Sequence, residues 1–220
     1  MIYVYNDSLD MDSVQLKKGE KLLSRERIEK MNRYKFQKDK TLCMIAFLLM
    51  RYGLEKEFGI SYIPRICTTA KGKLFFEKEL LCFNLSHCDT AVGCVIDKKQ
   101  VGIDVQNYTD EIIKIRNDFL TQMEAKKVFV KKDCIRELTA IWTLKEAYGK
   151  YYGDGLNYPF VQKDFSFIEN NTGWQNYEDL KIYSRQFTSY ALSVCSKQSM
   201  PIQIVRKKNL MDFVEREIRL

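Results

Sequence analysis

The spacing of apolar residues along this chain alternates between the period of a helix and that of a strand. The clearest helical pattern lies early in the chain, after a candidate N-cap at Asp39 and before Gly59, a residue suited to end a helix. Its apolar positions, three and four residues apart, are Leu42, Ile45, Ala46 and Leu49. The pattern predicts a core helix for the first half of the chain.

A charged helix is predicted just before it, over residues 24–34. Arg27, Lys30 and Arg33 stand three residues apart there and share one side of the helix. Such a basic stripe is either a solvated face or a surface that binds an anion, and the pattern alone leaves both readings open.

Helices are also expected in the second half of the chain. Thr121 and Glu124 have the spacing of a capping box, and Asp133 is placed to cap the helix that follows. Residues 209–219 are suited to a closing helix.

Strand-like segments, rich in β-branched and aromatic residues, separate these helices. A hairpin turn is predicted at Lys71–Lys73, where Gly72 permits a tight turn. The expected strands are residues 2–5, 62–67, 74–76, 81–85, 91–96, 101–105, 164–168, 180–184, 189–195 and 202–205.

Helices followed by antiparallel-type strands thus occur twice in the chain order. This order predicts an α+β fold with two pseudo-symmetric halves, each an antiparallel sheet packed with helices. We place the division at residues 1–99 and 100–220.

Composition narrows the class of protein. The 220-residue chain is 45% hydrophobic, which disfavours disorder. Its net charge of +7 favours an acidic partner such as a phosphorylated cofactor, an acidic protein, a nucleic acid or an anionic membrane surface. The basic residues are spread along the chain, whereas a general nucleic-acid binder more often carries one long basic stripe.

The seven cysteines indicate a cytoplasmic protein with reduced thiols, because their number is odd, none forms a C-x-x-C pair and no secretory leader precedes them. A single histidine and the lack of close cysteine pairs disfavour zinc. No apolar run is long enough to span a bilayer, so no membrane association is expected.

Candidate chemistry concentrates first in residues 141–152. Trp142, Glu146 and Lys150 recur every four residues, which places an indole, a carboxylate and an ammonium along one side of a helix that Gly153 is suited to end. A solvated Lys/Glu face is the simpler reading of this helix alone.

A second polar cluster, at Asn84–His87 and Gly102–Gln106, makes a binding site the stronger reading. Asp104 and Gln106 lie two residues apart and share one face of a strand, so their oxygens are placed to bind Mg²⁺ together. His87 is the only histidine and is either structural or binds an anion through a ring N–H.

The order of these motifs resembles that of the 4′-phosphopantetheinyl transferases, specifically the surfactin-synthetase-activating type with two halves in one chain. That family carries a G-K-P turn, an N-x-S-H element, a G-[IV]-D-[IVL]-E strand and a W-x-x-K-E-[AS]-x-x-K helix. The corresponding segments here are Gly72–Leu74, Asn84–His87, Gly102–Gln106 and Trp142–Lys150.

The resemblance implies a Mg²⁺-dependent enzyme that moves the phosphopantetheine arm of coenzyme A to a serine of an apo acyl or peptidyl carrier protein and releases 3′,5′-ADP. It implies no nucleic-acid partner and a monomer. The metal ligands would be Asp104, Gln106 and Glu146. The catalytic residues would be Glu146 and Lys150, with Glu124 as a second candidate base. The coenzyme A-binding residues would be Arg27, Lys30, Lys73, Ser86, His87, Lys145 and Lys150.

The chain departs from the family pattern at two positions. Gln106 stands where much of the family has glutamate, and Leu74 stands where proline is usual. The first departure leaves a degenerate transferase that binds coenzyme A without turnover as an alternative. A basic nucleic-acid-binding module is a weaker one, and it would need neither Asp104 nor Glu146.

Overall fold

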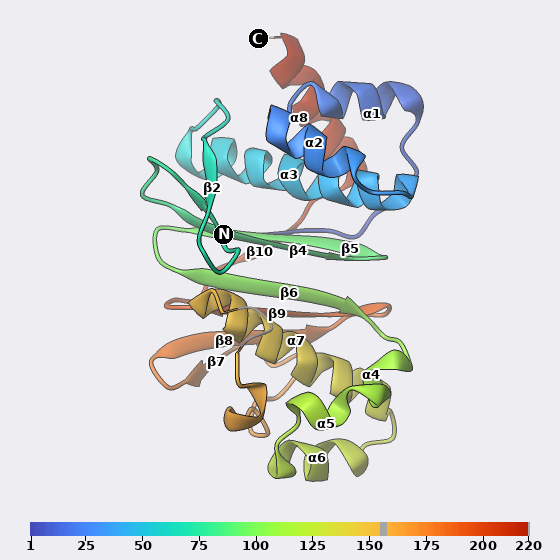
Figure 1. Cartoon of the computed structure of the whole chain (residues 1–220), viewed down its shortest axis with the longest axis vertical. Helices are drawn as coiled ribbons and strands as arrows, with labels where there is room; N and C mark the ends of the chain where they lie inside the picture. Colours follow the sequence, from blue (N-terminus) through green and yellow to red (C-terminus); the bar gives the residue numbers. More distant parts are fainter. Residues whose placement is uncertain (155–157, 220) are drawn as a thin grey trace.

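Two four-stranded sheets face each other in the middle of the molecule, and helices cover the outer face of each (Figure 1). The structure is a computed structural model that describes residues 1–154 and 158–219. The α+β class and the two-sheet organisation predicted above are confirmed.

The first sheet has the strand order β10-β1-β5-β4 and is mostly antiparallel, with β10 parallel to β1. Its strands are β1 (Ile2–Tyr5), β4 (Cys82–Cys88), β5 (Ala91–Asp97) and β10 (Ile202–Ile204). Four helices lie over it: α1 (Ser13–Glu20), α2 (Arg25–Asn32), α3 (Gln37–Phe58) and α8 (Lys207–Arg219). A separate hairpin, β2 (Ile66–Thr68) with β3 (Leu74–Phe76), projects beside them.

The second sheet is antiparallel, with the order β6-β9-β8-β7. Its strands are β6 (Val101–Asn107), β7 (Trp174–Tyr177), β8 (Leu180–Gln186) and β9 (Tyr190–Ser196). The long helix α7 (Cys134–Tyr152) crosses its outer face. Shorter helices lie beyond α7: α4 (Glu111–Lys114), α5 (Arg116–Phe119), α6 (Gln122–Phe129) and a 3₁₀ turn, η2 (Phe160–Gln162).

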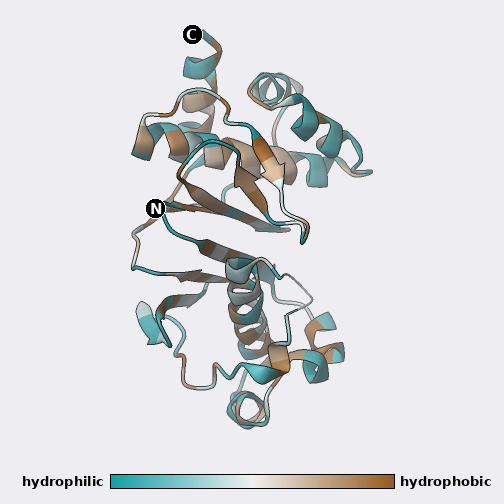
Figure 2. Cartoon of the chain, turned by 60° about the vertical axis from the view of Figure 1, so that its left-hand side comes forward, coloured by the Kyte–Doolittle hydropathy of each residue, from teal (hydrophilic) through white to brown (hydrophobic). Residues whose placement is uncertain are grey.

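Strand β1 belongs to two hydrophobic cores because its side chains alternate between faces. Tyr3 and Tyr5 pack with the core helix α3, whereas Ile2 and Val4 pack against residues of the second sheet. Apolar segments accordingly gather in the strands where the sheets face each other, and polar segments on the outer helices (Figure 2).

Helix α7 lies against β6 closely enough to require a glycine. A Cβ atom on Gly102 would stand 2.1 Å from the main-chain oxygen of Ala147 and 2.5 Å from the nitrogen of Tyr151. The helix ends where expected, at Gly153, whose φ of 82° is left-handed. Gly102 and Gly153 together place the last turns of α7 directly over β6, the strand that carries Asp104.

Several element boundaries differ from the sequence-based expectations. Helix α3 begins two residues before Asp39 and has no side-chain cap at Phe36. The strand expected at 62–67 is short and shifted, and residues 164–168 are irregular, with a turn at residues 166 and 167. Strand β4 continues through Ser86 and His87 and does not end at Leu85. Helices α1, α4 and α5 and strand β7 were not anticipated.

The last residues of the chain return to the first sheet. Strand β10 pairs with β1, and α8 packs against α1 and α3. We call each sheet together with the helices that cover it a layer. The division of the chain at residues 99 and 100 stays a proposal about its organisation, and any such division must assign residues 202–219 to the first layer, which contains the first sheet. None of the helices within residues 1–154 and 158–219 combines the length and apolar character needed to cross a membrane.

Candidate active site

Asp104 is the centre of a polar cluster between the two layers. It lies on β6, is only 1% exposed, and receives hydrogen bonds from three side chains. Lys150 Nζ is 2.6 Å and Ser86 Oγ 2.8 Å from one carboxylate oxygen, and Gln106 Nε2 is 3.1 Å from the other. The structure thus brings together side chains from β4, β6 and α7 that are distant in sequence.

Glu146 lies beside this cluster on α7 and is almost fully buried. Its Oε1 atom is buried without a hydrogen-bond partner in the described part of the chain. Burial raises the pKa of Glu146 to about 7, and the charge of Asp104 adds to this effect while Lys150 opposes it. A buried carboxylate oxygen with no donor is costly, so this site favours either a proton or a cation.

The donor set fits a hard divalent cation through two carboxylates and one amide. Asp104, Glu146 and the Gln106 amide oxygen are the oxygen ligands that Mg²⁺ prefers. No group of three His, Cys, Asp or Glu side chains with metal-binding geometry occurs in residues 1–154 and 158–219, which agrees with the amide at position 106. The ammonium of Lys150 supplies the positive charge beside Asp104 in this structure.

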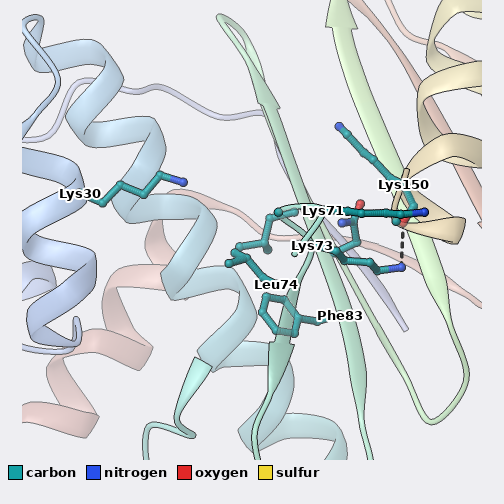
Figure 3. Close-up of a pocket in the computed structure, with 10 residues that line it drawn as sticks. Lys30, Lys71, Lys73, Leu74, Phe83 and Lys150 are labelled. Carbon is teal, nitrogen blue, oxygen red and sulfur yellow. Dashed lines mark hydrogen bonds between the residues drawn. The ribbon is translucent and has the colours of Figure 1, made fainter. Parts of the chain in front are cut away.

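A cavity of 260 Å³ adjoins the cluster and is lined by lysines from three elements (Figure 3). Lys30 reaches it from α2, Lys150 from α7, and Lys71 and Lys73 from the β2–β3 turn. A second cavity of 700 Å³ shares Lys30 with the first and has a largely apolar wall together with Arg27. Adjacent cationic and apolar spaces suit a ligand with both phosphate and non-polar parts.

Arg27 and Lys30 line this region, whereas Arg33, the third residue of the basic stripe, is exposed and does not line either cavity. Arg27 Nη2 donates to the main-chain oxygen of Cys43 at 3.0 Å, and its Nε is buried without a partner among the described residues. Burial, followed by the charge of Arg27, lowers the pKa of Lys30. Arg27 and Lys30, together with the buried N–H of Arg27 Nε, are suited to bind an anion.

His87 lies on β4 beside the same cations. Desolvation lowers its pKa, and the positive charges of Arg27 and Lys150 contribute further. A neutral imidazole with a ring N–H is a suitable hydrogen-bond donor to an anion in this position.

Lys73 adjoins the cavity, but its ammonium is engaged by the protein. Nζ donates to the main-chain oxygen of Lys150 at 2.7 Å (Figure 3). It also donates to the main-chain oxygen of Tyr151 at 2.7 Å and to Gln100 Oε1 at 2.9 Å. Burial lowers the pKa of Lys73 to about 8. The predicted role of Lys73 in cofactor binding therefore competes with a structural one.

Lys145 and Glu124 lie away from the Asp104 cluster. Both side chains are fully buried and form an ion pair at 2.8 Å. Lys145 also donates to the main-chain oxygens of Phe160 and Lys163, and Glu124 accepts from the amides of Thr121 and Phe165. With every strong partner already in place, this geometry supports neither cofactor binding by Lys145 nor proton transfer by Glu124, contrary to the expectations above.

Sequence reasoning did not anticipate the contribution of the β2–β3 turn beyond Lys73. Lys71 lines the cavity and pairs with Asp154 just after α7, and the wall also includes Phe83. The close lysine pair around Gly72 was the available signal, but the sequence does not reveal that this turn lies against the end of α7.

Comparisons with known proteins show which family this chain is similar to. A family model described as the 4′-phosphopantetheinyl transferase superfamily matches residues 100–205. The chain is 29% identical over 183 residues to the 4′-phosphopantetheinyl transferase gsp of Aneurinibacillus migulanus, an alignment that covers 79% of this chain and 76% of that protein.

Two Bacillus subtilis proteins are also similar. The chain is 27% identical over 156 residues to a 4′-phosphopantetheinyl transferase and 26% identical over 141 residues to the 4′-phosphopantetheinyl transferase Sfp of strain 168. Each alignment covers 62% of this chain and 63% of the relative. The fold, the polar cluster on β6 and α7, and these comparisons together show that the chain is similar to the 4′-phosphopantetheinyl transferase superfamily, which the family model matches over residues 100–205.

Proposed function

We propose that this protein transfers the 4′-phosphopantetheine arm of coenzyme A to a serine of an apo acyl or peptidyl carrier protein. The reaction forms a bond between the serine oxygen and the phosphorus next to pantetheine, breaks the pyrophosphate P–O bond and releases 3′,5′-ADP. The observation that carries this proposal is the buried Asp104, Glu146 and Lys150 cluster beside a lysine-lined cavity.

The phosphates of coenzyme A carry several negative charges and need fixed cations around them. Lys30 and Lys150 from opposite walls of the cavity are suited to this role, and Arg27 and His87 lie beside them. Lys150 would neutralise the charge that develops on the departing phosphate, which would favour the transition state. The larger cavity is suited to the nucleoside part because of its apolar wall.

A Mg²⁺ ion bound by Asp104, Glu146 and the Gln106 amide oxygen would neutralise charge on the pyrophosphate. The Oε1 atom of Glu146, which is buried without a hydrogen-bond partner among the described residues, supports this assignment. Lys150, which now pairs with Asp104, would then be free to turn toward the phosphates.

Glu146 is our candidate for accepting the serine proton. Without metal its pKa is raised to about 7, which suits a group that exchanges protons near neutral pH. The fully buried Glu124 is the poorer candidate, since its ammonium partner Lys145 is already in place. A single chain supplies both walls of the cavity, so we further propose that the enzyme acts as a monomer. Its free cysteines suit the reducing cytoplasm, which we propose as its location.

Intact-mass spectrometry of apo carrier proteins tests the proposal. Carriers of fatty-acid, polyketide and peptide-synthetase type are incubated with the protein, coenzyme A and Mg²⁺, with and without EDTA. We expect one carrier or more to gain the mass of one phosphopantetheine group, and the gain to disappear with EDTA. Coenzyme A binding without any mass gain would favour the degenerate transferase that Gln106 first suggested.

An Asp104→Ala variant tests the metal assignment. We expect its transfer rate to fall by about 100-fold or more, because the metal loses a carboxylate ligand and Lys150 its partner. Asp212→Ala, at an exposed position on α8, is the matched control and is expected to retain full activity. Wild-type turnover by Asp104→Ala would refute the metal site.

A further inference from the structure

The free edge of β6 is the least expected feature of the site. Among residues 1–154 and 158–219, β6 pairs with β9 on one side only and is the outermost strand of its sheet. Every second residue of such a strand directs its main-chain N–H and C=O groups outward, and buried groups of this kind need partners. β4 is the nearest strand of the other sheet, but the two strands form no backbone ladder among the described residues.

Side chains of the first layer satisfy this edge in place of a strand. Asn84 Oδ1 accepts from the amide of Ile103 at 2.9 Å, and Ser86 Oγ accepts from the amide of Val105 at 3.2 Å. Both pairs keep the same offset of 19 residues, because alternate side chains of β4 meet alternate amides of β6.

Lys73 extends the same row at the start of β6. Its ammonium lies 3.3 Å from the main-chain oxygen of Val101, the next outward-facing residue. The same Nζ donates to the oxygens of Lys150 and Tyr151 in the last turn of α7. Lysine is favourable at a helix C-terminus, where unpaired carbonyls carry partial negative charge. Lys73 therefore links the edge of β6 to the end of the helix above it.

The contacts that Ser86 and Lys73 make along β6 also position the groups around the Asp104 carboxylate. Ser86 Oγ accepts from the Val105 amide and donates to Asp104 Oδ1 at 2.8 Å. Lys150, whose main-chain oxygen Lys73 holds, reaches the same carboxylate oxygen at 2.6 Å. The position of Asp104 relative to α7 is thus defined by a row of side chains from the first layer.

We propose that Lys73, Asn84 and Ser86 act together as an edge cap of β6 that positions Asp104 against Glu146 and Lys150. Asn84 and Lys73 are then positioning residues whose main effect is on the geometry of the metal ligands, and not on direct contact with coenzyme A. The inference rests on the proposed function for its kinetic test, but the contacts themselves are testable without activity.

Hydrogen exchange of the full-length protein gives the activity-independent test. Asn84→Leu keeps the side-chain size but removes the acceptor, so the Ile103 amide is expected to exchange about five- to tenfold faster. Asn84→Asp retains the acceptor oxygen and is expected to restore protection. Asn176→Leu, at an exposed position on β7, is the matched control and should leave Ile103 unchanged. Unchanged exchange in Asn84→Leu would overturn the edge cap.

Kinetics then separate positioning from direct binding. For Asn84→Leu and for Lys73→Met, we expect the Mg²⁺ concentration for half-maximal transfer to rise about fivefold, with the KM for coenzyme A within about twofold of wild type. A large rise in that KM with unchanged Mg²⁺ dependence would show direct binding and refute the proposal. If the wild type modified no carrier, the proposed function would fail, and the exchange rates alone would decide on the edge cap.

Lys73→Met provides an independent structural readout if Asn84→Leu does not fold. Without the ammonium, the last turn of α7 loses its partners, and the amide of Gly153, which bonds to Gly149, should exchange about fivefold faster. Lys78→Met, at an exposed position outside the cavity, is the control. Unchanged exchange at Gly153 would count against a link between the edge and the helix.

Discussion

The charge at the centre of the site depends on which atoms face Asp104. Two carboxylates, Asp104 and Glu146, contribute to the cluster, and the third position carries the neutral amide of Gln106. The amide donates to Asp104 through Nε2, which leaves its oxygen as the weaker of the three candidate metal ligands. Replacing this amide by a carboxylate therefore tests how the charge at position 106 affects Mg²⁺ binding.

Gln106→Glu should strengthen Mg²⁺ binding. The added negative charge is expected to lower the Mg²⁺ concentration for half-maximal transfer by about three- to tenfold, with equal or higher activity at low Mg²⁺. Without metal, the same variant should be less stable by about 1 kcal/mol, because a third carboxylate crowds the site. Metal titrations of activity and of thermal unfolding check both results. A large loss of activity at all Mg²⁺ concentrations would contradict the proposed role of the amide.

The raised pKa of Glu146 predicts a pH-dependent metal site. The folded protein holds this proton more tightly than the unfolded chain, so stability without metal should fall as the pH rises from 4.5 to about 7. Metal binding needs the carboxylate, and Mg²⁺ should therefore bind about tenfold more weakly at pH 6 than at pH 8. Calorimetric titration with Mg²⁺ at the two pH values measures this ratio. In Glu146→Gln the remaining Mg²⁺ affinity should lose that dependence; a dependence equal to wild type would assign it to another group.

The residues that the sequence grouped correctly lie on regular elements. Asp104 and Gln106 share one face of a strand, and Glu146 and Lys150 share one side of a helix. The two-residue period of a strand and the 3.6-residue period of a helix are therefore enough to predict that the members of each pair lie close together. Lys73 is different, because a lysine side chain is long and its partner atoms are main-chain oxygens that no sequence pattern identifies.

At the scale of elements, the buried ion pair of Lys145 and Glu124 joins α7, α6 and the segment at residues 160–165. Lys145 on α7 meets Glu124 on α6, and both reach the segment between Phe160 and Phe165. The pair is fully buried and has hydrogen bonds on both sides. Such a pair fixes how these elements pack, and removing one partner leaves the other charged and buried.

Lys145→Met should therefore destabilise the protein by about 3–5 kcal/mol. The double variant Lys145→Met/Glu124→Gln is expected to recover part of this loss, because the remaining partner is then neutral. Urea denaturation measures both, with Lys78→Met as an exposed control. If Lys145 instead bound coenzyme A, Lys145→Met would keep its stability and show a raised KM for coenzyme A.

Most elements were predictable from period and caps, and the misses have physical causes. The capping box at Thr121, the N-cap at Asp133 and the glycine after α7 gave correct ends, since all three signals are local. Helix α1 was missed because its apolar pattern is weak, and it is held by contacts with α3 and α8. Residues 164–168 have strand composition but are irregular, with a turn at residues 166 and 167, and the Phe165 amide bonds to Glu124 and not to a strand.

At the scale of the whole molecule, the two layers share one interior. Ile2 and Val4 of the first sheet pack with Ile103 and Val105 of the second, and this core joins residues far apart in sequence. Periodicity predicts the apolar face of each sheet but not the element against which it packs. The return of β10 and α8 to the first layer was likewise beyond local patterns, since parallel pairing with β1 is set by tertiary contacts.

A shared interior predicts that both layers unfold together. The two tryptophans, Trp142 and Trp174, lie in the second layer, so their fluorescence follows that layer while far-UV circular dichroism follows both. Because the core and the edge cap cross the interface, the two signals should give the same urea midpoint. Separate midpoints would mean that the layers are independent folding units.

Gly93 allows a sharper version of this experiment. It lies on β5 in the first sheet, and a Cβ atom there would come within 2.8 Å of Ile103 and 2.9 Å of Val105 on the second. Gly93→Val should push the sheets apart and cost about 1–3 kcal/mol. If the layers are coupled, this change in the first sheet lowers the midpoint of the tryptophan signal in the second by as much as that of the circular dichroism. A tryptophan midpoint that stays at the wild-type value would show that the second layer is stable without its contacts to the first.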